Sequence, residues 1–222
     1  MKSRNKKKSR TKPKLRLFVL GATGKTGGAL VAQAVAHGHF VTTFGRSSFQ
    51  GADRAKVTSI SGDPMNEQQL ADALPGHDAV LSVLGTRGLG ASSLLDESSR
   101  ATIGAMRKAG VRRLVILSSA LLDKNIGIVD RIVGRTVLRH FSRDQRAMEK
   151  RVTASKLDWT VLRPPRMSDS APEGPSTVTL TEPANGAGMK IRKEEVARLM
   201  LDAVENGKNL GRLVHVRGAT RA

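Results

Sequence analysis

The sequence contains neither cysteine nor tyrosine, and each absence removes a class of chemistry. Without cysteine, the chain forms no disulfide and offers no thiolate as a metal ligand or nucleophile. Without tyrosine, it has no phenol to serve as a general acid. Aromatic residues make up 3% of the chain, so platforms for stacking single-stranded nucleic acid are scarce. Any catalysis by this protein must therefore use other side chains or a bound group.

Long apolar runs are also missing. No stretch approaches the roughly 20 residues needed to cross a bilayer, and the apolar run at 15–20 is too short for the core of a secretory signal. The 222 residues are 39% hydrophobic, which suffices for the core of one domain. We therefore expect a cytoplasmic, single-domain monomer with no membrane span.

Acidic residues are few: 19 of them stand against 38 lysines and arginines, a formal net charge of +19. Nine of the basic residues lie within the first 16 positions, which hold no acidic residue, and the other 29 still exceed the acidic ones by ten. Residues 1–14 are predicted to form a disordered basic tail, because they lack apolar side chains and repel one another. This tail is either a solvated extension or a weak contact for nucleic acid or another polyanion.

Between residues 15 and 217, short apolar runs alternate with helical patterns. The expected strands are 15–20, 40–44, 57–60, 78–84, 113–118, 159–162, 177–181 and 212–216. The expected helices are 26–37, 66–74, 93–109, 142–155 and 193–205. This alternation predicts an α/β fold in which helices cover both faces of a parallel sheet.

The expected topology is a Rossmann-type, doubly wound sheet with the strand order 3-2-1-4-5-6. Residues 164–190 are rich in proline, glycine, serine and threonine, which predicts a small C-terminal substrate lobe. The domain should therefore span residues 15–217, followed by a short C-terminal tail at 218–222.

Three glycines, Gly21, Gly24 and Gly27, follow the first strand and open the first helix. In a dinucleotide site, one such glycine permits a tight turn, the second lets a pyrophosphate approach the backbone, and the third lets helix and strand pack closely. The helix N-terminus then presents free amides to the phosphates. Three polar side chains of this segment can add hydrogen bonds and one charge: Thr23, Lys25 and Thr26. The alternative is a purely structural glycine turn.

The piece Gly24-Lys25-Thr26 resembles the end of a P-loop, but that motif needs a glycine where this chain has Val19. A nucleoside triphosphatase is therefore excluded.

The end of the second strand indicates which dinucleotide is bound. A site specific for NAD would place Asp or Glu there, whereas this chain has Arg46, Ser47 and Ser48 and no acid before Asp53. Arg46 can pair with a 2′-phosphate, and the serines can donate hydrogen bonds to it. The pattern predicts NADP(H) as the cofactor; the alternative is an exposed arginine in a basic protein.

Two further segments follow predicted strands. Asp63, after the third strand, is expected beside the adenine, where its carboxylate could accept from the exocyclic amine; an ordinary loop carboxylate is an equal alternative. Gly85, Thr86 and Arg87 follow the fourth strand, at the switch point where a cofactor crosses the sheet edge.

In their order and spacing, these pieces resemble the atypical short-chain dehydrogenases known as NAD(P)H-binding or NmrA-like proteins. The likeness is greatest to the branch of NADPH-dependent flavin reductases and biliverdin reductase B. The segments that carry it, over residues 15–217, are 21–27, Arg46, Gly62-Asp63, Leu84-Gly85-Thr86-Arg87, Ser118-Ser119-Ala120, Pro164-Pro165-Arg166 and 177–180. The segment from Leu84 to Arg87 is among the pieces more specific to this branch.

The resemblance implies hydride transfer from NADPH to flavins or linear tetrapyrroles. It implies a catalytic role for Ser119 near the nicotinamide and places Ser118 and Pro165 among the cofactor-binding residues. Without the resemblance, a serine at a strand end is as readily an ordinary helix cap or turn residue. Two positions depart from the family pattern, because Arg166 and Gln145 stand where histidines are common. Both are expected to face substrate or cofactor, and Arg166 could attract an acidic substrate or a flavin phosphate.

Ordinary short-chain dehydrogenases use a Tyr-x-x-x-Lys pair, which this chain cannot form. His140 is predicted to lie on a helix surface, and no histidine pairs with a metal ligand at a useful spacing, so no metal site is expected. Flavin reduction needs a protein proton donor less than carbonyl reduction does. We therefore expect an NADPH-dependent reductase of a flavin or quinone-like acceptor. The alternatives are a non-catalytic NADP(H)-binding regulator and, third, a relative of sugar-nucleotide epimerases.

Overall fold

The computed structural model describes residues 13–51, 55–85, 92–123, 139–171, 176–180 and 190–218. Most of the predicted basic tail and the segment holding Thr86 and Arg87 lie outside these ranges. The elements in chain order are β1 (Arg16–Leu20), α1 (Lys25–Ala36), β2 (Phe40–Gly45), β3 (Val57–Ser61), α2 (Glu67–Ala73), β4 (Ala79–Ser82), α3 (Leu94–Ala109), β5 (Arg113–Leu117), the 3₁₀ turn η1 (Ala120–Leu122), α5 (Arg139–Thr153), β6 (Asp158–Arg163), β7 (Arg166–Met167), β8 (Thr177–Thr179), β9 (Lys190–Ile191), α6 (Lys193–Glu205) and β10 (Arg212–Arg217).

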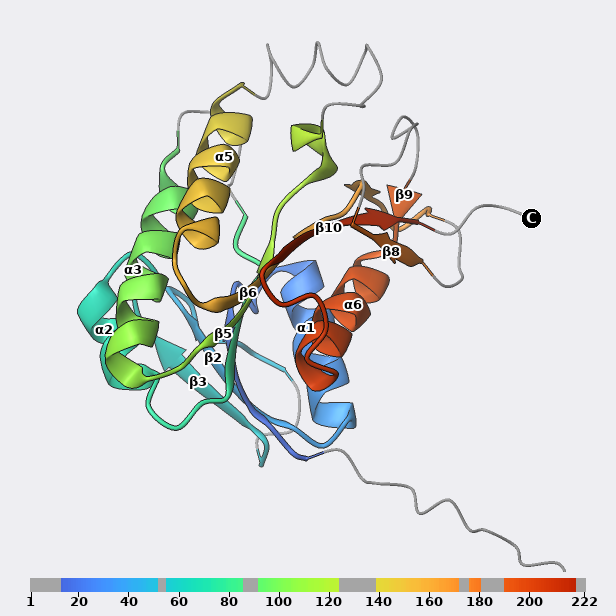
Figure 1. Cartoon of the computed structure of the whole chain (residues 1–222). Coiled ribbons are helices and arrows are strands. Elements are labelled where there is room, and N and C mark those ends of the chain that lie inside the picture. Colours follow the sequence, from blue (N-terminus) through green and yellow to red (C-terminus); the bar gives the residue numbers. More distant parts are fainter. Residues whose placement is uncertain are drawn as a thin grey trace, which may run out of the picture.

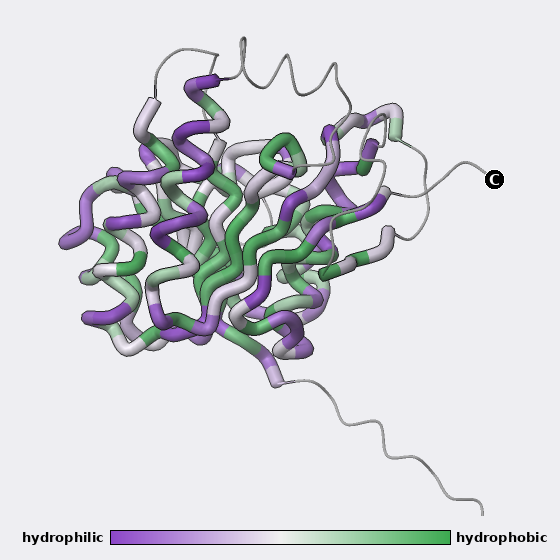
Figure 2. The backbone as a smooth tube through the Cα atoms, turned by 45° about the horizontal axis from the view of Figure 1, so that its top comes forward, coloured by the Kyte–Doolittle hydropathy of each residue, from purple (hydrophilic) through white to green (hydrophobic). Residues whose placement is uncertain are grey.

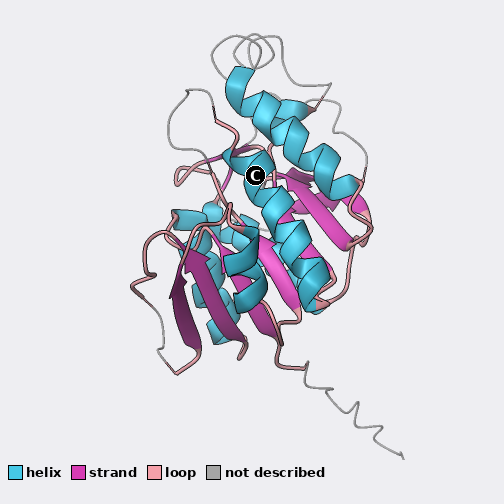
Figure 3. Cartoon of the chain, turned by 90° about the vertical axis from the view of Figure 1, so that its left-hand side faces the viewer, coloured by secondary structure: helices cyan, strands magenta, loops and turns pink. Residues whose placement is uncertain are grey.

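The main sheet has the order β3-β2-β1-β4-β5-β6-β10-β8, which confirms the predicted order of the first six strands. All neighbours are parallel except β8, which runs antiparallel to β10. Helices α1 and α6 pack together on one face, and α2, α3 and α5 cover the other (Figures 1 and 3). The fold is thus a single Rossmann-like α/β domain.

Successive side chains of β1 point to opposite faces of the sheet and join the two hydrophobic cores that lie there. Leu17 and Val19 join the apolar cluster under α1 and α6, whereas Phe18 and Leu20 join the cluster under α2, α3 and α5. A strand covered on both faces must be apolar throughout, and the hydropathy colouring in Figure 2 shows the central strands as mainly hydrophobic. These buried strands hold their carboxyl ends at one edge, where the loops gather.

Local signals placed several element ends correctly. Asn66 caps α2 by accepting from the Gln69 amide, and Gly110 ends α3 with a φ of 72°. The fourth strand, expected at 78–84, stops at Ser82 because its neighbour β1 ends at Leu20. Helix α5 begins at Arg139, earlier than the expected start at 142.

The C-terminal segment differs most from the sequence-based expectation. The strand expected at 177–181 is β8, and it extends the main sheet instead of belonging only to a separate lobe. Strands β7 and β9 form a small parallel pair that the sequence pattern did not predict. Alternating polarity indicates a strand but does not name its partner, so these pairings depend on tertiary structure.

Candidate cofactor site

The turn between β1 and α1 needs two of its three glycines for the fold itself. Gly21 has a φ of +85°, and a Cβ on it would lie 2.8 Å from the carbonyl of Val83. A Cβ on Gly27 would lie 2.2 Å from the Gly21 oxygen, which no real contact allows. These residues therefore bring α1 close to the end of β1, as the motif predicts.

Gly24 is different, because the fold does not require a glycine there. Its φ is −79°, and a Cβ would meet only the Gly21 oxygen, at 3.4 Å. Gly24 is the N-cap of α1 without a side-chain cap, and the first turn of the helix holds no acidic residue. The missing side chain leaves open access to the amides at the positive end of the helix. This is the geometry that a dinucleotide pyrophosphate needs.

A groove of about 1050 Å³ extends from this turn along the carboxyl ends of the strands. It is lined by the whole glycine segment, by the end of β2, by Pro64 and Met65, and by residues after β4 and before α3. The predicted cofactor residues that line it are Gly21, Thr23, Gly24, Lys25, Thr26, Gly27, Arg46, Ser47, Leu84 and Gly85. Thr86 and Arg87, also predicted to bind cofactor, lie outside the described residues.

The charged side chains that line the groove in the described chain are all cationic. Among the described lining residues, Lys25, Arg46 and Lys193 are cationic and none is acidic. Gly45 and Gly85 widen the groove further, since a Cβ on either would meet no atom within 4 Å. The groove thus fits an extended anionic ligand, and the residues present agree with a dinucleotide.

Arg46 stands exposed at the end of β2, and no ion pair in the described chain includes it. Ser47 beside it is also exposed, while the Ser48 hydroxyl lies 3.1 Å from that of Ser61. The guanidinium is thus available at the groove rim, where sequence reasoning placed the 2′-phosphate.

Asp63 forms hydrogen bonds that stabilise the turn before α2. Its carboxylate accepts from the Met65 amide at 3.0 Å, and its own amide donates to the Gln69 side chain at 2.8 Å. Asp63 is not among the groove-lining residues, although the next two residues are. Its contact with adenine stays a prediction.

Residues in and just after β7 contact the glycine turn and the start of α6. Asp169 accepts from Lys25 at 3.2 Å and from Lys193 at 2.5 Å, and the Thr26 hydroxyl lies 3.7 Å from the Met167 sulfur. Hydrogen bonds from Lys193 and Lys25 lower the pKa of Asp169 below its ordinary value. Sequence reasoning missed Lys193, because only the tertiary structure brings the start of α6 to this groove.

The predicted serines at the end of β5 both have partners within the protein. Ser119 caps η1, since its hydroxyl oxygen accepts from the Leu121 amide at 3.2 Å. Ser118 is buried and donates to Glu149 at 2.6 Å. Pro165 is also buried, directly after Pro164, whose carbonyl accepts from the Ala120 amide. None of these three predicted residues lines the groove described above.

Behind Ser118 lies a buried polar network that sequence reasoning missed. Arg163 donates twice to Glu149, at 2.9 and 2.6 Å, and once to Asp123 at 2.8 Å. The other oxygen of Asp123 lies 3.0 Å from Nδ1 of His215. Burial opposes the charge on Arg163, but the bonds to Glu149 and Asp123 outweigh it and raise the pKa of the guanidinium. No sequence signal links residues so far apart in the chain.

The two predicted substrate residues differ in exposure. Gln145 on α5 is 4% exposed, and its side-chain oxygen has no hydrogen-bond partner among the residues that the structure describes. A buried acceptor without a donor is costly, which is a reason to look for a ligand N–H at this point. Arg166 on β7 is exposed, one residue before Met167.

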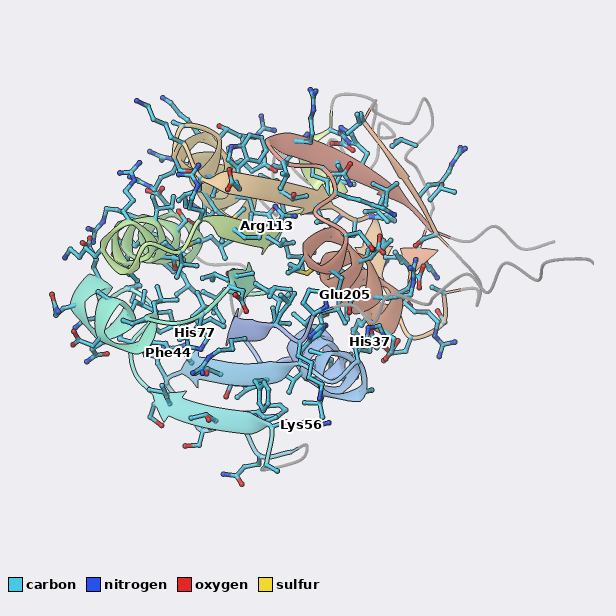
Figure 4. All side chains as sticks on the ribbon, turned by 60° about the horizontal axis from the view of Figure 1, so that its bottom comes forward. His37, Phe44, Lys56, His77, Arg113 and Glu205 are labelled. Atoms are coloured by element: carbon cyan, nitrogen blue, oxygen red, sulfur yellow. The ribbon has the colours of Figure 1, made fainter. Side chains whose placement is uncertain are left out.

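Two histidines that showed no ligand spacing in the sequence meet one carboxylate at the other end of the molecule. Nδ1 of His37 and Nε2 of His39 lie 2.6 and 2.9 Å from Oε1 of Glu205, and Figure 4 shows His37 beside Glu205. The Leu15 amide donates to Nδ1 of His39, so Nε2 of that ring carries the proton and donates to Glu205. This arrangement favours hydrogen bonding over ligation of a metal.

In the part of the chain that the structure describes, no helix has the length and apolar character needed to cross a membrane.

Comparison with known proteins agrees with this geometry. UPF0659 protein YMR090W of Saccharomyces cerevisiae is 26% identical over 204 residues, covering 86% of this chain and 87% of the yeast protein. A short-chain dehydrogenase/reductase from Veillonella parvula, in complex with NADP, has a TM-score of 0.77 at 16% identity and covers 92% of this chain and 94% of its own. A Streptococcus pneumoniae protein classed as an NADH-flavin reductase has a TM-score of 0.74 at 21% identity. That match covers 92% of this chain and 100% of the Streptococcus protein.

The two solved structures share the fold of this chain. A model of the NAD(P)H-binding family matches residues 21–207, from the first glycine of the turn to just past the end of α6. The glycine turn, the cationic groove and this match lead to one conclusion: the chain belongs to the NAD(P)H-binding family.

Proposed function

We propose that this protein is an NADPH-dependent reductase that delivers hydride to a flavin or a similar flat acceptor such as a quinone. The observation that carries the proposal is the groove at the carboxyl ends of the strands. It joins the open amides of the glycine turn to three cations, of which Arg46 has no ion-pair partner in the described chain and Lys25 and Lys193 share the single carboxylate of Asp169. None of its described lining residues is itself acidic. Such a lining stabilises a ligand with several phosphoryl groups and disfavours a neutral one.

The preference for NADPH over NADH follows from the end of β2. The extra phosphoryl group of NADPH would meet the exposed Ser47 and Arg46, whose exposed guanidinium has no ion-pair partner in the described chain. NADH would leave the Arg46 guanidinium unused, and the described lining residues of the groove include no carboxylate for its ribose hydroxyls.

The remaining residues would orient the reactants. NADPH, when bound, supplies the hydride. Ser119, half-buried at the end of β5, would position the nicotinamide, and Gln145 offers an unpaired buried oxygen to a ring N–H of the acceptor. Arg166 would attract an acidic acceptor such as a flavin phosphate. Because no tyrosine is available, the proton would come from solvent, and the protein would contribute mainly proximity and orientation.

Cofactor preference is tested with Arg46→Ala. We expect NADPH affinity to fall about tenfold, the equivalent of one charge-assisted contact, and NADH affinity to stay unchanged. Arg212→Ala, an exposed arginine on β10 far from β2 in the sheet, is the matched control and should change neither affinity. Equal wild-type affinity for the two cofactors, measured by fluorescence titration, would contradict the role of Arg46.

Catalysis is tested by following NADPH oxidation with FMN, riboflavin and a quinone. We expect turnover with at least one of them, and a loss of roughly tenfold to hundredfold in kcat for Ser119→Ala at unchanged NADPH affinity. Tight NADPH binding without turnover on any acceptor would favour the non-catalytic NADP(H)-binding regulator instead.

A further inference from the structure

The outer surface of α5 carries a regular row of cations. Arg139, Arg143, Arg146 and Lys150 are separated by four, three and four residues, and all four are exposed. Side chains at this spacing lie on one stripe of a helix, about 5–6 Å apart. With a rise of 1.5 Å per residue, the stripe extends over roughly 16 Å.

The row is not neutralised by the protein. Within the described chain, Arg143, Arg146 and Lys150 take part in no ion pair. The two carboxylates of α5 are buried and engaged elsewhere: Asp144 accepts from the amides of Leu95 and Asp96, and Glu149 pairs with Arg163. The positive field of the stripe is therefore directed to solvent.

A trough beside the stripe extends the same charge. Small residues, Gly104 on α3 and Ala147 and Ala154 on and after α5, help to form a hollow of about 690 Å³ between the helices. Arg100 and Arg107 of α3 line it opposite Lys150. The acidic lining residues are already paired: Glu67 with Lys108 and, at 3.9 Å, with Arg100, and Asp96 with Arg151.

This surface is separate from the cofactor groove. It belongs to the layer of α2, α3 and α5, whereas α1 and α6 cover the opposite face of the sheet (Figure 3 shows the side with the former layer). No residue of the stripe or of its trough lines the groove.

We propose that this basic stripe, Arg139, Arg143, Arg146 and Lys150 with the adjoining trough, binds the phosphodiester backbone of nucleic acid without reading its sequence. A regular row of unpaired guanidinium and ammonium groups matches a regular row of phosphates, and the affinity comes from release of condensed counterions. The stripe accounts for part of the excess of basic over acidic residues that remains outside the N-terminal tail.

Two other occupants fit less well. Binding to an anionic membrane is strong where apolar side chains insert beside the cations, but those of α5, such as Met148 and Val152, are buried against the sheet. A second copy docked through this face would oppose like charges across a two-fold axis, because the same patch meets itself.

The test uses the full-length chain and a fluorescein-labelled duplex of 20 base pairs, followed by fluorescence anisotropy between 50 and 200 mM salt. We expect wild-type binding that weakens steeply with salt. The triple variant Arg143→Gln, Arg146→Gln, Lys150→Gln should bind at least tenfold more weakly at the lowest salt. Its slope of log affinity against log salt should be smaller by about two to three.

The matched control removes three positive charges outside the stripe, its trough and the N-terminal tail: Lys56→Gln, Lys208→Gln, Arg212→Gln. It should keep most of the affinity and slope. Equal losses in the two triple variants, or no wild-type binding, would overturn the proposal. So would binding only to vesicles with 30% phosphatidylserine, or a dimer in sedimentation that the stripe variant alone dissociates. NADPH affinity, expected unchanged in both variants, reports that they are folded.

Discussion

Gly24 and Gly27 are both in the glycine turn, but a methyl group would meet different surroundings at the two positions. At Gly27 it would lie 2.2 Å from a backbone oxygen that cannot move aside without distorting the turn. At Gly24 it would lie at ordinary van der Waals distance from the protein and project where a pyrophosphate would bind. One glycine is therefore required for folding, and the other leaves room for a ligand.

The two substitutions should separate these roles. Gly27→Ala is expected to lower the free energy of unfolding by about 2 kcal/mol or more, the range of overpacking in tight sites. Gly24→Ala should cost less than about 1 kcal/mol as a change of helix N-cap but weaken NADPH binding at least tenfold. Urea denaturation and fluorescence titration measure the two effects, and equal losses of stability in the two variants would contradict the distinction.

At the scale of elements, one carboxylate connects the start of β8 to α6. Oε1 of Glu195 accepts from the amide and hydroxyl of Ser176, at 2.9 and 2.6 Å, and from Arg198 at 2.7 Å. Burial raises the pKa of Glu195, but the bonds from Arg198 and Ser176 outweigh it and lower the pKa to about 2. The ionised form is thus the one that the fold stabilises.

This contact should make stability depend on pH. Since folding lowers the pKa of Glu195, its contribution is complete above the ordinary glutamate pKa of about 4.3 and is lost as the pH falls toward 2. Glu195→Gln should therefore be less stable than wild type at pH 7, by about 1 kcal/mol after screening by solvent. The difference should shrink between pH 5 and 2. Urea denaturation at several pH values measures this difference, and a difference that stays constant from pH 7 to pH 2 would contradict the role of Glu195.

At the scale of the whole molecule, the network around Arg163 joins elements from distant parts of the chain. It connects the end of β5 through Ser118, α5 through Glu149, the residue after η1 through Asp123, and β10 through His215. These residues are buried where the sheet meets the C-terminal segment. The network thus fixes the end of β5, α5 and β10 relative to one another, and these elements lie next to the residues that we propose contact the substrate.

Removing its central cation should be costly. Arg163→Met leaves two buried carboxylates without their partner, so we expect a loss of about 3–5 kcal/mol in unfolding free energy. Arg112→Met breaks the exposed pair with Asp158 and should cost less than about 1 kcal/mol. If thermal or urea unfolding shows similar losses of unfolding free energy in both variants, the network does not stabilise the fold as predicted.

Much of the fold could be predicted because its signals are local. Apolar runs defined the strands, Asn66 and Gly110 marked helix ends, and the glycine turn after β1 placed the groove on the correct sheet edge. Right-handed crossovers then allow few strand orders, and the observed one is among them. The groove-lining residues next to that turn followed from the same pattern.

The sequence by itself determined the parallel sheet, the glycine turn and an end of β2 without an acid, since each depends on residues close together in the chain. Only the tertiary structure decided that β8 joins β10, that Lys193 enters the groove, and that Arg163 pairs with Glu149 and Asp123. The physical reason is that each of these contacts joins segments that are far apart in the chain. Side-chain periodicity specifies which face of an element is buried but not which partner lies against it.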